Sequence, residues 1–192
     1  MRKLVLLLLF PTIVNLLRAQ EQQTAAIGDF KLQSGEIIRD CVIGYRVFGA
    51  LNSEKSNAVL FPTAFGWKSA GLASRIGPGK LVDSDKYFVI AIDSLADGVS
   101  SSPSNSKTQT GLGFPQFSIR DLVNAEYKVV TEKLRLSHLH AVVGFSMGGM
   151  QAFQWAVSYP DFVDAIISIV GSPQLTSYDF ASMAHYAVGA SV

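Results

Sequence analysis

The feature that most constrains the fold is the segment Gly144-Phe145-Ser146-Met147-Gly148, which stands between two different hydrophobic patterns. A continuous apolar run over 140–144 leads into it and predicts a buried strand. Apolar side chains at helical spacing follow it and stop at Pro160, which predicts a helix. Glycines on both sides of Ser146 permit a sharp strand-to-helix turn, so we expect its hydroxyl to project into open space.

A serine held on such a turn is typical of a catalytic nucleophile. The helix beyond it offers free N–H groups and a positive dipole end where an oxyanion would form. We predict the N–H of Met147 as one oxyanion donor and the N–H of Phe65 or Ala64, after the run 57–61, as the other. The alternative is a glycine-rich junction of a nucleotide-binding protein, but the sequence contains neither Gly-x-Gly-x-x-Gly nor Gly-Lys-Ser/Thr.

The other hydrophobic runs predict a mixed α/β fold. Strand-like segments at 29–32 and 42–48 flank a turn and predict an antiparallel hairpin. Further buried strands are predicted at 57–61, 87–93, 140–144 and 163–170. These runs are continuous rather than alternating, which indicates strands covered by helices on both faces of a mostly parallel sheet.

Two helices are predicted between the later strands, each with an apolar face. The first is predicted to bury Ile119, Leu122, Val123, Tyr127, Val130 and Leu134, with Asp121, Glu126, Lys128 and Glu132 on its polar face. The second is predicted to present Met150, Phe153, Gln154, Ala156 and Val157. Between the strands and the first helix, segment 95–115 is rich in Gly, Ser, Pro, Asn and Thr; it is either a flexible surface loop or a loop that lines the site.

The N-terminus has the order of parts of an export signal. Arg2 and Lys3 precede an apolar stretch over 4–14, and 17–19 offers a small-residue cleavage site. We therefore expect a signal peptide over 1–19 and a mature domain over 20–192 that works in the periplasm or outside the cell. The apolar stretch is short for a stable membrane span. A buried N-terminal helix is the alternative, and the polar segment 20–24 is expected to be a solvated leader.

Charge and residue types exclude several classes of partner. With 16 basic and 15 acidic residues the net charge is +1, which gives no electrostatic case for nucleic acid. The single cysteine, Cys41, lies in an apolar stretch and is expected to be a buried packing residue. We expect no cofactor and no metal. The expected partner is a small-molecule ester or acyl donor. Whether the protein forms a homodimer stays open.

Several sequence blocks stand in a fixed order along the chain: Asn57-Ala58-Val59-Leu60, Gly77-Pro78-Gly79-Lys80, 83–90, Phe114-Pro115, Ile119-Arg120-Asp121, 146–151 and 155–160. This is the order seen in homoserine O-acetyltransferases, and over about 30–172 the chain resembles that branch of the α/β-hydrolase superfamily. The resemblance implies an α/β-hydrolase fold and a ping-pong acyl transfer in which Ser146 forms an acyl-enzyme. The family's His-Ala-Leu-Thr-Gly loop is replaced here by Thr63-Ala64-Phe65-Gly66, which leaves the acyl acceptor open.

The resemblance also implies an aspartate and a histidine far downstream of Ser146, after a helical lid that would begin near 173. The chain stops at Val192, so we expect it to be the N-terminal portion of the domain. None of the remaining candidates is expected to serve as base or orienting acid: His138, His140, His185, Asp161, Asp164 and Asp179. The hypotheses are a serine esterase or acyltransferase, a remnant without the triad, and a genuine homoserine O-acetyltransferase, which the export signal disfavours.

Overall fold

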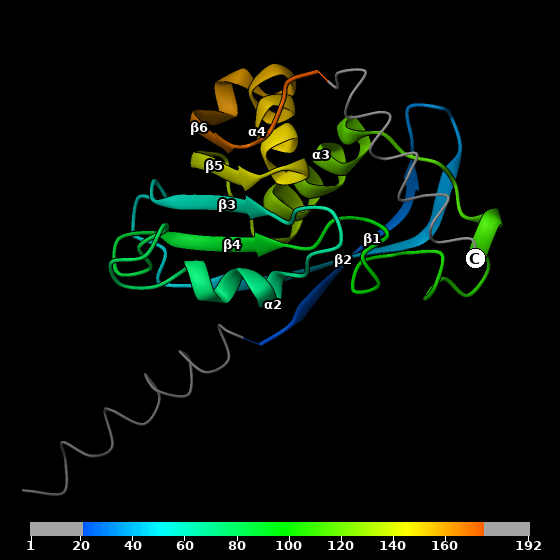
Figure 1. Ribbon diagram of the computed structural model, residues 1–192, viewed down its shortest axis with the longest axis horizontal. Helices are drawn as coiled ribbons and strands as arrows, with labels where there is room; N and C mark the ends of the chain where they lie inside the picture. Colours follow the sequence, from blue (N-terminus) through cyan, green and yellow to red (C-terminus); the bar gives the residue numbers. More distant parts are fainter. Residues whose placement is uncertain (1–20, 175–192) are drawn as a thin grey trace, which may run out of the picture.

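A computed structural model describes residues 21–174, which form a six-stranded sheet with helices against it (Figure 1). The strands lie in the order β1-β2-β4-β3-β5-β6. Their bounds are Gln23–Lys31 for β1, Ile37–Phe48 for β2, Ala58–Pro62 for β3, Phe88–Ile92 for β4, Leu139–Phe145 for β5 and Val163–Ile169 for β6. All six strands expected from the hydrophobic runs are present.

The pairing of the strands confirms the mixed sheet. β1 pairs antiparallel with β2, and β2 pairs antiparallel with β4. β3 is parallel to both of its neighbours, β4 and β5, and β5 is parallel to β6. The carboxyl ends of β3, β4 and β5 therefore meet at one edge of the sheet, which is where open α/β folds place their sites.

The predicted solvated leader at 20–24 is corrected in part. β1 begins at Gln23 rather than near Asp29, and the side-chain amide of Gln22 donates to Asp93 Oδ2 at 2.9 Å. The sequence could not show this, because the carboxylate that satisfies the amide lies 71 positions away along the chain.

The helices are α2 (Ser69–Leu72), α3 (Ile119–Lys128) and α4 (Met147–Ser158). The predicted helix over 119–134 is divided, because α3 continues as a π-helical turn over Val129–Lys133. Ser118 begins α3 with a capping box: its hydroxyl accepts from the Asp121 N–H, and the Asp121 carboxylate accepts from the Ser118 N–H. Single 3₁₀ turns follow or precede other elements at Ala73–Arg75, Gly111–Gly113 and Pro160–Phe162.

Alternate residues of each central strand enter different cores, one on each face of the sheet. Leu60 of β3 packs in the core that includes Trp155 of α4 and Leu122 of α3. Its neighbours Val59 and Phe61 pack in the opposite core with Leu72 of α2. Figure 1 shows α2 beside β4 and, apart from it, α3 and α4 beside β5 and β6. Helices thus cover both faces, as the continuous apolar strands predicted.

The predicted apolar face of the second helix was wrong. The side of α4 that packs against the sheet carries Gly148, Gly149, Gln151, Ala152 and Trp155, whereas Val157 is 71% exposed. Which side of α4 faces the sheet is set by how closely the helix approaches β5 and β6, and Gly148 and Gly149 permit that approach. Hydrophobicity alone cannot identify a face whose key members are glycines and a glutamine.

The predicted polar face of α3 was also partly wrong, since Asp121 and Glu126 are both buried. Asp121 caps its own helix and also accepts from the Gln33 N–H at 2.8 Å. Glu126 Oε2 accepts from the Trp155 indole N–H at 2.7 Å. Burial raises the pKa of Glu126 to about 8, although the indole hydrogen bond acts in the other direction.

Cys41 is fully buried, as expected of a packing residue, and burial raises the pKa of its thiol to about 11. Across residues 21–174 no helix combines the length and the hydropathy that crossing a membrane requires. The expected signal peptide at 1–19, the lid near 173, His185 and Asp179 lie wholly or mainly outside the described residues, and those expectations stay predictions.

Candidate active site

Ser146 lies at the junction between β5 and α4 in a conformation that few non-glycine residues adopt. Its φ is 50° and its ψ is −117°, and its side chain is exposed. Two hydrogen bonds fix the backbone: the Ser146 N–H donates to the Ile169 carbonyl at 2.9 Å, and its carbonyl accepts from Met150 at 3.0 Å. Such strain persists only where the surroundings enforce it, and it is characteristic of functional turns.

Three glycines let the backbone close around this turn. A Cβ atom on Gly148 would lie 2.6 Å from the carbonyl oxygen of Pro62, at the end of β3. A Cβ atom on Gly149 would lie 2.6 Å from Ser168 Oγ on β6. Gly144 approaches Gly148 still more closely. The first turn of α4 therefore rests directly on the ends of two strands, which holds Ser146 rigidly above the edge of the sheet.

The segment after β3 places two further N–H groups at the same edge. Ala64 is buried and Phe65 is 77% exposed, and the turn they begin is closed by the bond from the Trp67 N–H to the Ala64 carbonyl at 3.0 Å. Within residues 21–174, no hydrogen bond has the N–H of Met147, Ala64 or Phe65 as its donor. These N–H groups therefore have no acceptor among the described residues. That they bind an oxyanion stays a prediction, and the choice between Ala64 and Phe65 stays open.

A buried polar cluster beneath this edge was missed by the sequence analysis. The Gln151 amide donates to the Thr63 carbonyl at 3.2 Å and to Ser94 Oγ at 3.3 Å. Thr63 and Ser94 are themselves joined, since the Ser94 N–H donates to Thr63 Oγ1 at 3.0 Å. The signal in the sequence was a glutamine, Gln151, three residues after Gly148 in a helix that is otherwise mostly apolar.

A second buried cluster surrounds Asp93, at the end of β4. Its carboxylate accepts from the Ser69 N–H at 2.6 Å and from the Ser69 hydroxyl at 2.7 Å, which fixes the start of α2. Burial raises the pKa of the nearby Asp97 to about 6, and the Asp93 carboxylate adds to the rise. Among residues 21–174 there is no group of three or more His, Cys, Asp or Glu side chains arranged to hold a metal ion.

The two histidines in the described part of the chain lie at the opposite end of β5 from Ser146. His138 Nε2 is 2.9 Å from Asp164 Oδ2, and the His140 ring stacks on Tyr87 at 5.2 Å between centroids. A strand rises about 3.3 Å per residue, so His140 is on the order of 20 Å from the serine. Neither histidine can take the proton of Ser146, as expected, and Asp164 is engaged with them instead.

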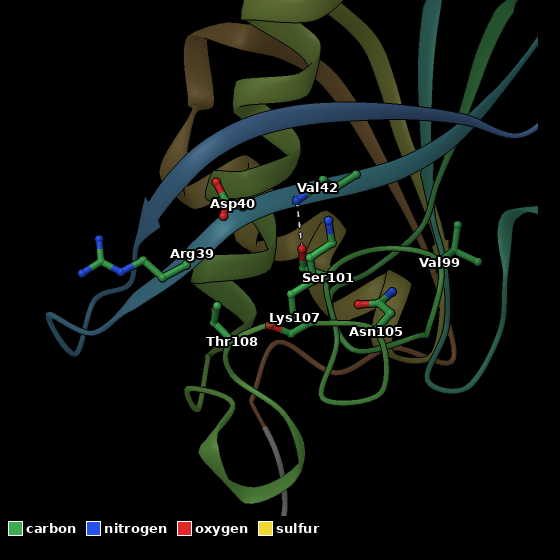
Figure 2. Close-up of a pocket in the computed structure, with 9 residues that line it drawn as sticks. Arg39, Asp40, Val42, Val99, Ser101, Asn105, Lys107 and Thr108 are labelled. Atoms are coloured by element: carbon green, nitrogen blue, oxygen red, sulfur yellow. Dashed lines mark hydrogen bonds between the residues drawn. The ribbon is translucent and has the colours of Figure 1, made fainter.

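The loop predicted at 95–115 is tied to β2. Ser101 bonds to Val42 twice, through its N–H at 2.8 Å and through its hydroxyl, which accepts from the Val42 N–H at 2.9 Å (Figure 2). Between this loop and β2 lies an open groove of about 400 Å³, lined by Arg39, Asp40, Val42, Val99, Ser101, Asn105, Ser106, Lys107 and Thr108. Ser146, Met147 and Phe65 are not among these residues, so the groove is separate from the candidate site. Figure 2 shows Arg39 extending away from it, and Arg39 is paired with Asp29.

Comparison with known proteins places this geometry in a family. Residues 58–187 match the alpha/beta hydrolase fold family. Over 156 residues the chain is 38% identical to an ethyl acetate hydrolase of Pseudomonas veronii, covering 80% of this chain and 45% of that protein. Over 161 residues it is 38% identical to a homoserine O-acetyltransferase of Methanosalsum zhilinae, covering 75% of this chain and 32% of the other.

A solved structure shares the arrangement of the elements. An acetylester hydrolase from Corynebacterium glutamicum superposes with a TM-score of 0.81 at 35% identity, over 84% of this chain and 47% of that chain. The chain thus spans about half or less of the length of these relatives. The resemblance to homoserine O-acetyltransferases is confirmed, and esterases are equally similar.

Proposed function

The chain belongs to the alpha/beta hydrolase family, and on that premise we propose that it carries the nucleophile of an enzyme that cleaves a small ester through an acyl-enzyme. The relatives named above are esterases and a homoserine acyltransferase. The observation that carries the proposal is the strained conformation of Ser146 beside N–H groups without a described hydrogen-bond acceptor. Acyl transfer requires an exposed hydroxyl together with free N–H groups that can stabilise the oxyanion.

In the proposed reaction Ser146 Oγ attacks the ester carbonyl and loses its proton to a general base. The carbonyl oxygen becomes an oxyanion, which accepts from the Met147 N–H and from the N–H of Phe65 or Ala64. Collapse of this intermediate breaks the bond to the alcohol, which leaves with a proton, and an acyl-Ser146 ester remains. Water, or a second hydroxyl compound, then attacks the acyl group by the same steps in reverse. The resemblance implies that the base and its orienting acid come from downstream of residue 174.

Hydrolysis is the proposed outcome, with acetyl transfer to homoserine as the second candidate. Hydrolysis is supported by the sequence Thr63-Ala64-Phe65-Gly66, which differs from the acyltransferase loop, and by the similarity to an ethyl acetate hydrolase. Transfer is supported by the comparable identity to homoserine O-acetyltransferases. Both candidates use the same acyl-enzyme and differ only in what accepts the acyl group.

The test uses the complete open reading frame that contains these residues. We expect p-nitrophenyl acetate to be hydrolysed and a fluorophosphonate probe to label Ser146, as read by peptide mass spectrometry. Both signals should vanish in Ser146→Ala, while Ser158→Ala, a matched serine at the far end of α4, should retain them. If the probe never labels Ser146, the hypothesis of a remnant without a catalytic triad is supported instead. Faster acetylation of homoserine from acetyl-CoA than hydrolysis would establish the transferase.

We also propose that the protein is exported. The proposal rests on the order of charged, apolar and small residues over 1–19. The mature protein recovered from the periplasm or medium is expected to begin near Gln20 by N-terminal sequencing. Exchange of the apolar stretch for polar residues should hold the protein in the cytoplasm. Recovery of the unprocessed chain from the cytoplasm of the native host would refute export.

A further inference from the structure

Gln151 is a fully buried glutamine on the first turns of the helix that follows the candidate nucleophile. Its side chain crosses from α4 to the ends of β3 and β4. The amide nitrogen lies 3.2 Å from the Thr63 carbonyl, 3.3 Å from Ser94 Oγ and 3.3 Å from the carbonyl of Met147. Because carbonyl oxygens only accept, the nitrogen and not the oxygen of the amide must face them.

Stability does not explain a glutamine at this position. Gln151 Oε1 is buried and has no hydrogen-bond partner within residues 21–174. A buried acceptor without a donor is costly, and an apolar side chain of the same shape would avoid that cost. The Thr63 carbonyl would keep a second donor, since Ser94 Oγ lies 3.4 Å from it. What the glutamine contributes is a specific link between two segments.

The segments it links are the two that supply the candidate oxyanion donors. Met147, whose N–H is the first donor, accepts from Gln151 through its carbonyl. Thr63, which accepts from the same amide, directly precedes Ala64 and Phe65, whose N–H groups are the candidates for the second donor. Thr63 is held on its other side as well, by the bond from its N–H to the Ile92 carbonyl at 3.1 Å. The buried amide of Gln151 therefore donates to the backbone beside both candidate oxyanion donors.

We propose that Gln151 is a positioning residue that sets the distance between the two oxyanion donors. This inference rests on the proposed function of Ser146. Gln151 does not touch the substrate; it acts through Met147 and Thr63. Oxyanion donors act mainly in the transition state, so a displaced donor lowers kcat and leaves KM nearly unchanged. Loss of a whole donor costs about 100- to 1,000-fold in kcat, and a displaced one is expected to cost about 10- to 100-fold.

The test measures p-nitrophenyl acetate hydrolysis by the complete protein, with active sites counted by fluorophosphonate labelling carried to completion. Gln151→Met keeps the volume and removes the amide. The matched control is Gln154→Met, on the same helix, whose amide bonds only to Ser158 Oγ at 2.7 Å among the described residues. We expect Gln151→Met to lose about 10- to 100-fold in kcat per active site with KM within about two-fold, and Gln154→Met to match the wild type.

A second variant distinguishes a positioning role of Gln151 from a role in folding. It also provides the test if Gln151→Met does not fold. In Gln151→Glu the ionised carboxylate repels the Thr63 carbonyl, whereas the protonated form donates an O–H to it. The ratio of variant to wild-type kcat is therefore expected to rise as the pH is lowered. A role in packing alone would leave that ratio independent of pH.

The outcomes for the two proposals are distinct. Unchanged kcat per active site in Gln151→Met, or a flat pH ratio in Gln151→Glu, overturns the role of Gln151 while Ser146→Ala remains inactive. Turnover that survives in Ser146→Ala overturns the proposed function itself, whatever the Gln151 variants do.

Discussion

Gly144 and Gly148 approach each other so closely that a Cβ atom on Gly144 would lie 2.1 Å from both the carbonyl carbon and the carbonyl oxygen of Gly148. No real Cβ atom tolerates that distance, and both atoms it would meet belong to backbone. The contact joins the last residues of β5 to the first turn of α4. It explains in steric terms why Gly144, two residues before Ser146, must lack a side chain, as the contact with the Pro62 carbonyl does for Gly148, two residues after it.

Gly144→Ala is expected to destabilise the protein by about 3 kcal/mol and to abolish labelling of Ser146, because the turn must open to admit the methyl group. Thermal unfolding and fluorophosphonate labelling measure the two effects. Gly71→Ala in α2 is the matched control, since a Cβ there meets nothing within 4 Å. Wild-type stability in Gly144→Ala would contradict the close approach.

Ser146→Gly is expected to raise the stability of the fold while removing activity. The φ of 50° at Ser146 carries strain that glycine does not feel, and relief of it is worth about 1–3 kcal/mol before the greater flexibility of glycine in the unfolded chain is subtracted. We expect a net gain of about 1 kcal/mol in urea unfolding. Ser146→Ala, which keeps the strain, should show no such gain; equal stability of the two variants would argue against a strained serine.

Glu126 is expected to make stability depend on pH. An unfolded glutamate loses its proton near its ordinary pKa of 4.5, whereas the folded one keeps it up to about 8. The folded state then binds the extra proton between these values, so the contribution of Glu126 to stability is greatest below pH 4.5 and falls as the pH rises toward 8. By pH 7 the loss from this group is on the order of 3 kcal/mol.

Glu126→Gln is expected to remove that pH dependence, because its amide oxygen still accepts from the Trp155 indole but does not titrate. Urea midpoints compared at about pH 5 and about pH 8 measure the change. Glu132→Gln, at an exposed glutamate of the turn that continues α3, is the matched control and should retain the wild-type slope. Asp97, whose pKa burial raises to about 6, is expected to leave a smaller slope in Glu126→Gln. An undiminished wild-type slope would place its origin elsewhere.

The edge strand β6 is expected to make residues 1–192 associate or precipitate when they are expressed alone. In the described part of the chain β6 pairs only with β5, and Ile167 and Val170 are 49% and 84% exposed. An unpaired apolar edge is a template for pairing with other chains. Sedimentation velocity should show species larger than a monomer, reduced by Ile167→Lys. Val157→Lys, at an exposed apolar side chain of α4 outside the strands, is the control; a cooperative monomer would contradict the prediction.

Much of the architecture was predictable because its signals are local. The turn at Ser146 needs only the glycines around it, a strand before it and a helix after it. The buried strands are predicted by continuous apolar runs. The antiparallel pairing at the start of the sheet is predicted by a turn between two strand-like segments. Each of these signals acts over a few residues, so the position of the rest of the chain does not alter it.

What the sequence by itself determined is therefore the elbow, the mixed sheet and the family. What only the tertiary structure decided is which polar side chains are buried and why. Glu126 is buried because Trp155, 29 positions away, offers it an indole N–H, and Gln151 is buried because the Thr63 carbonyl, 88 positions away, accepts from it. Burial of a polar group costs free energy that a hydrogen-bond partner offsets, and partners so distant in sequence meet only when the sheet has formed. The hydroxyl of Ser146 was visible from its neighbours; the amide that bonds beside its candidate oxyanion donors was not.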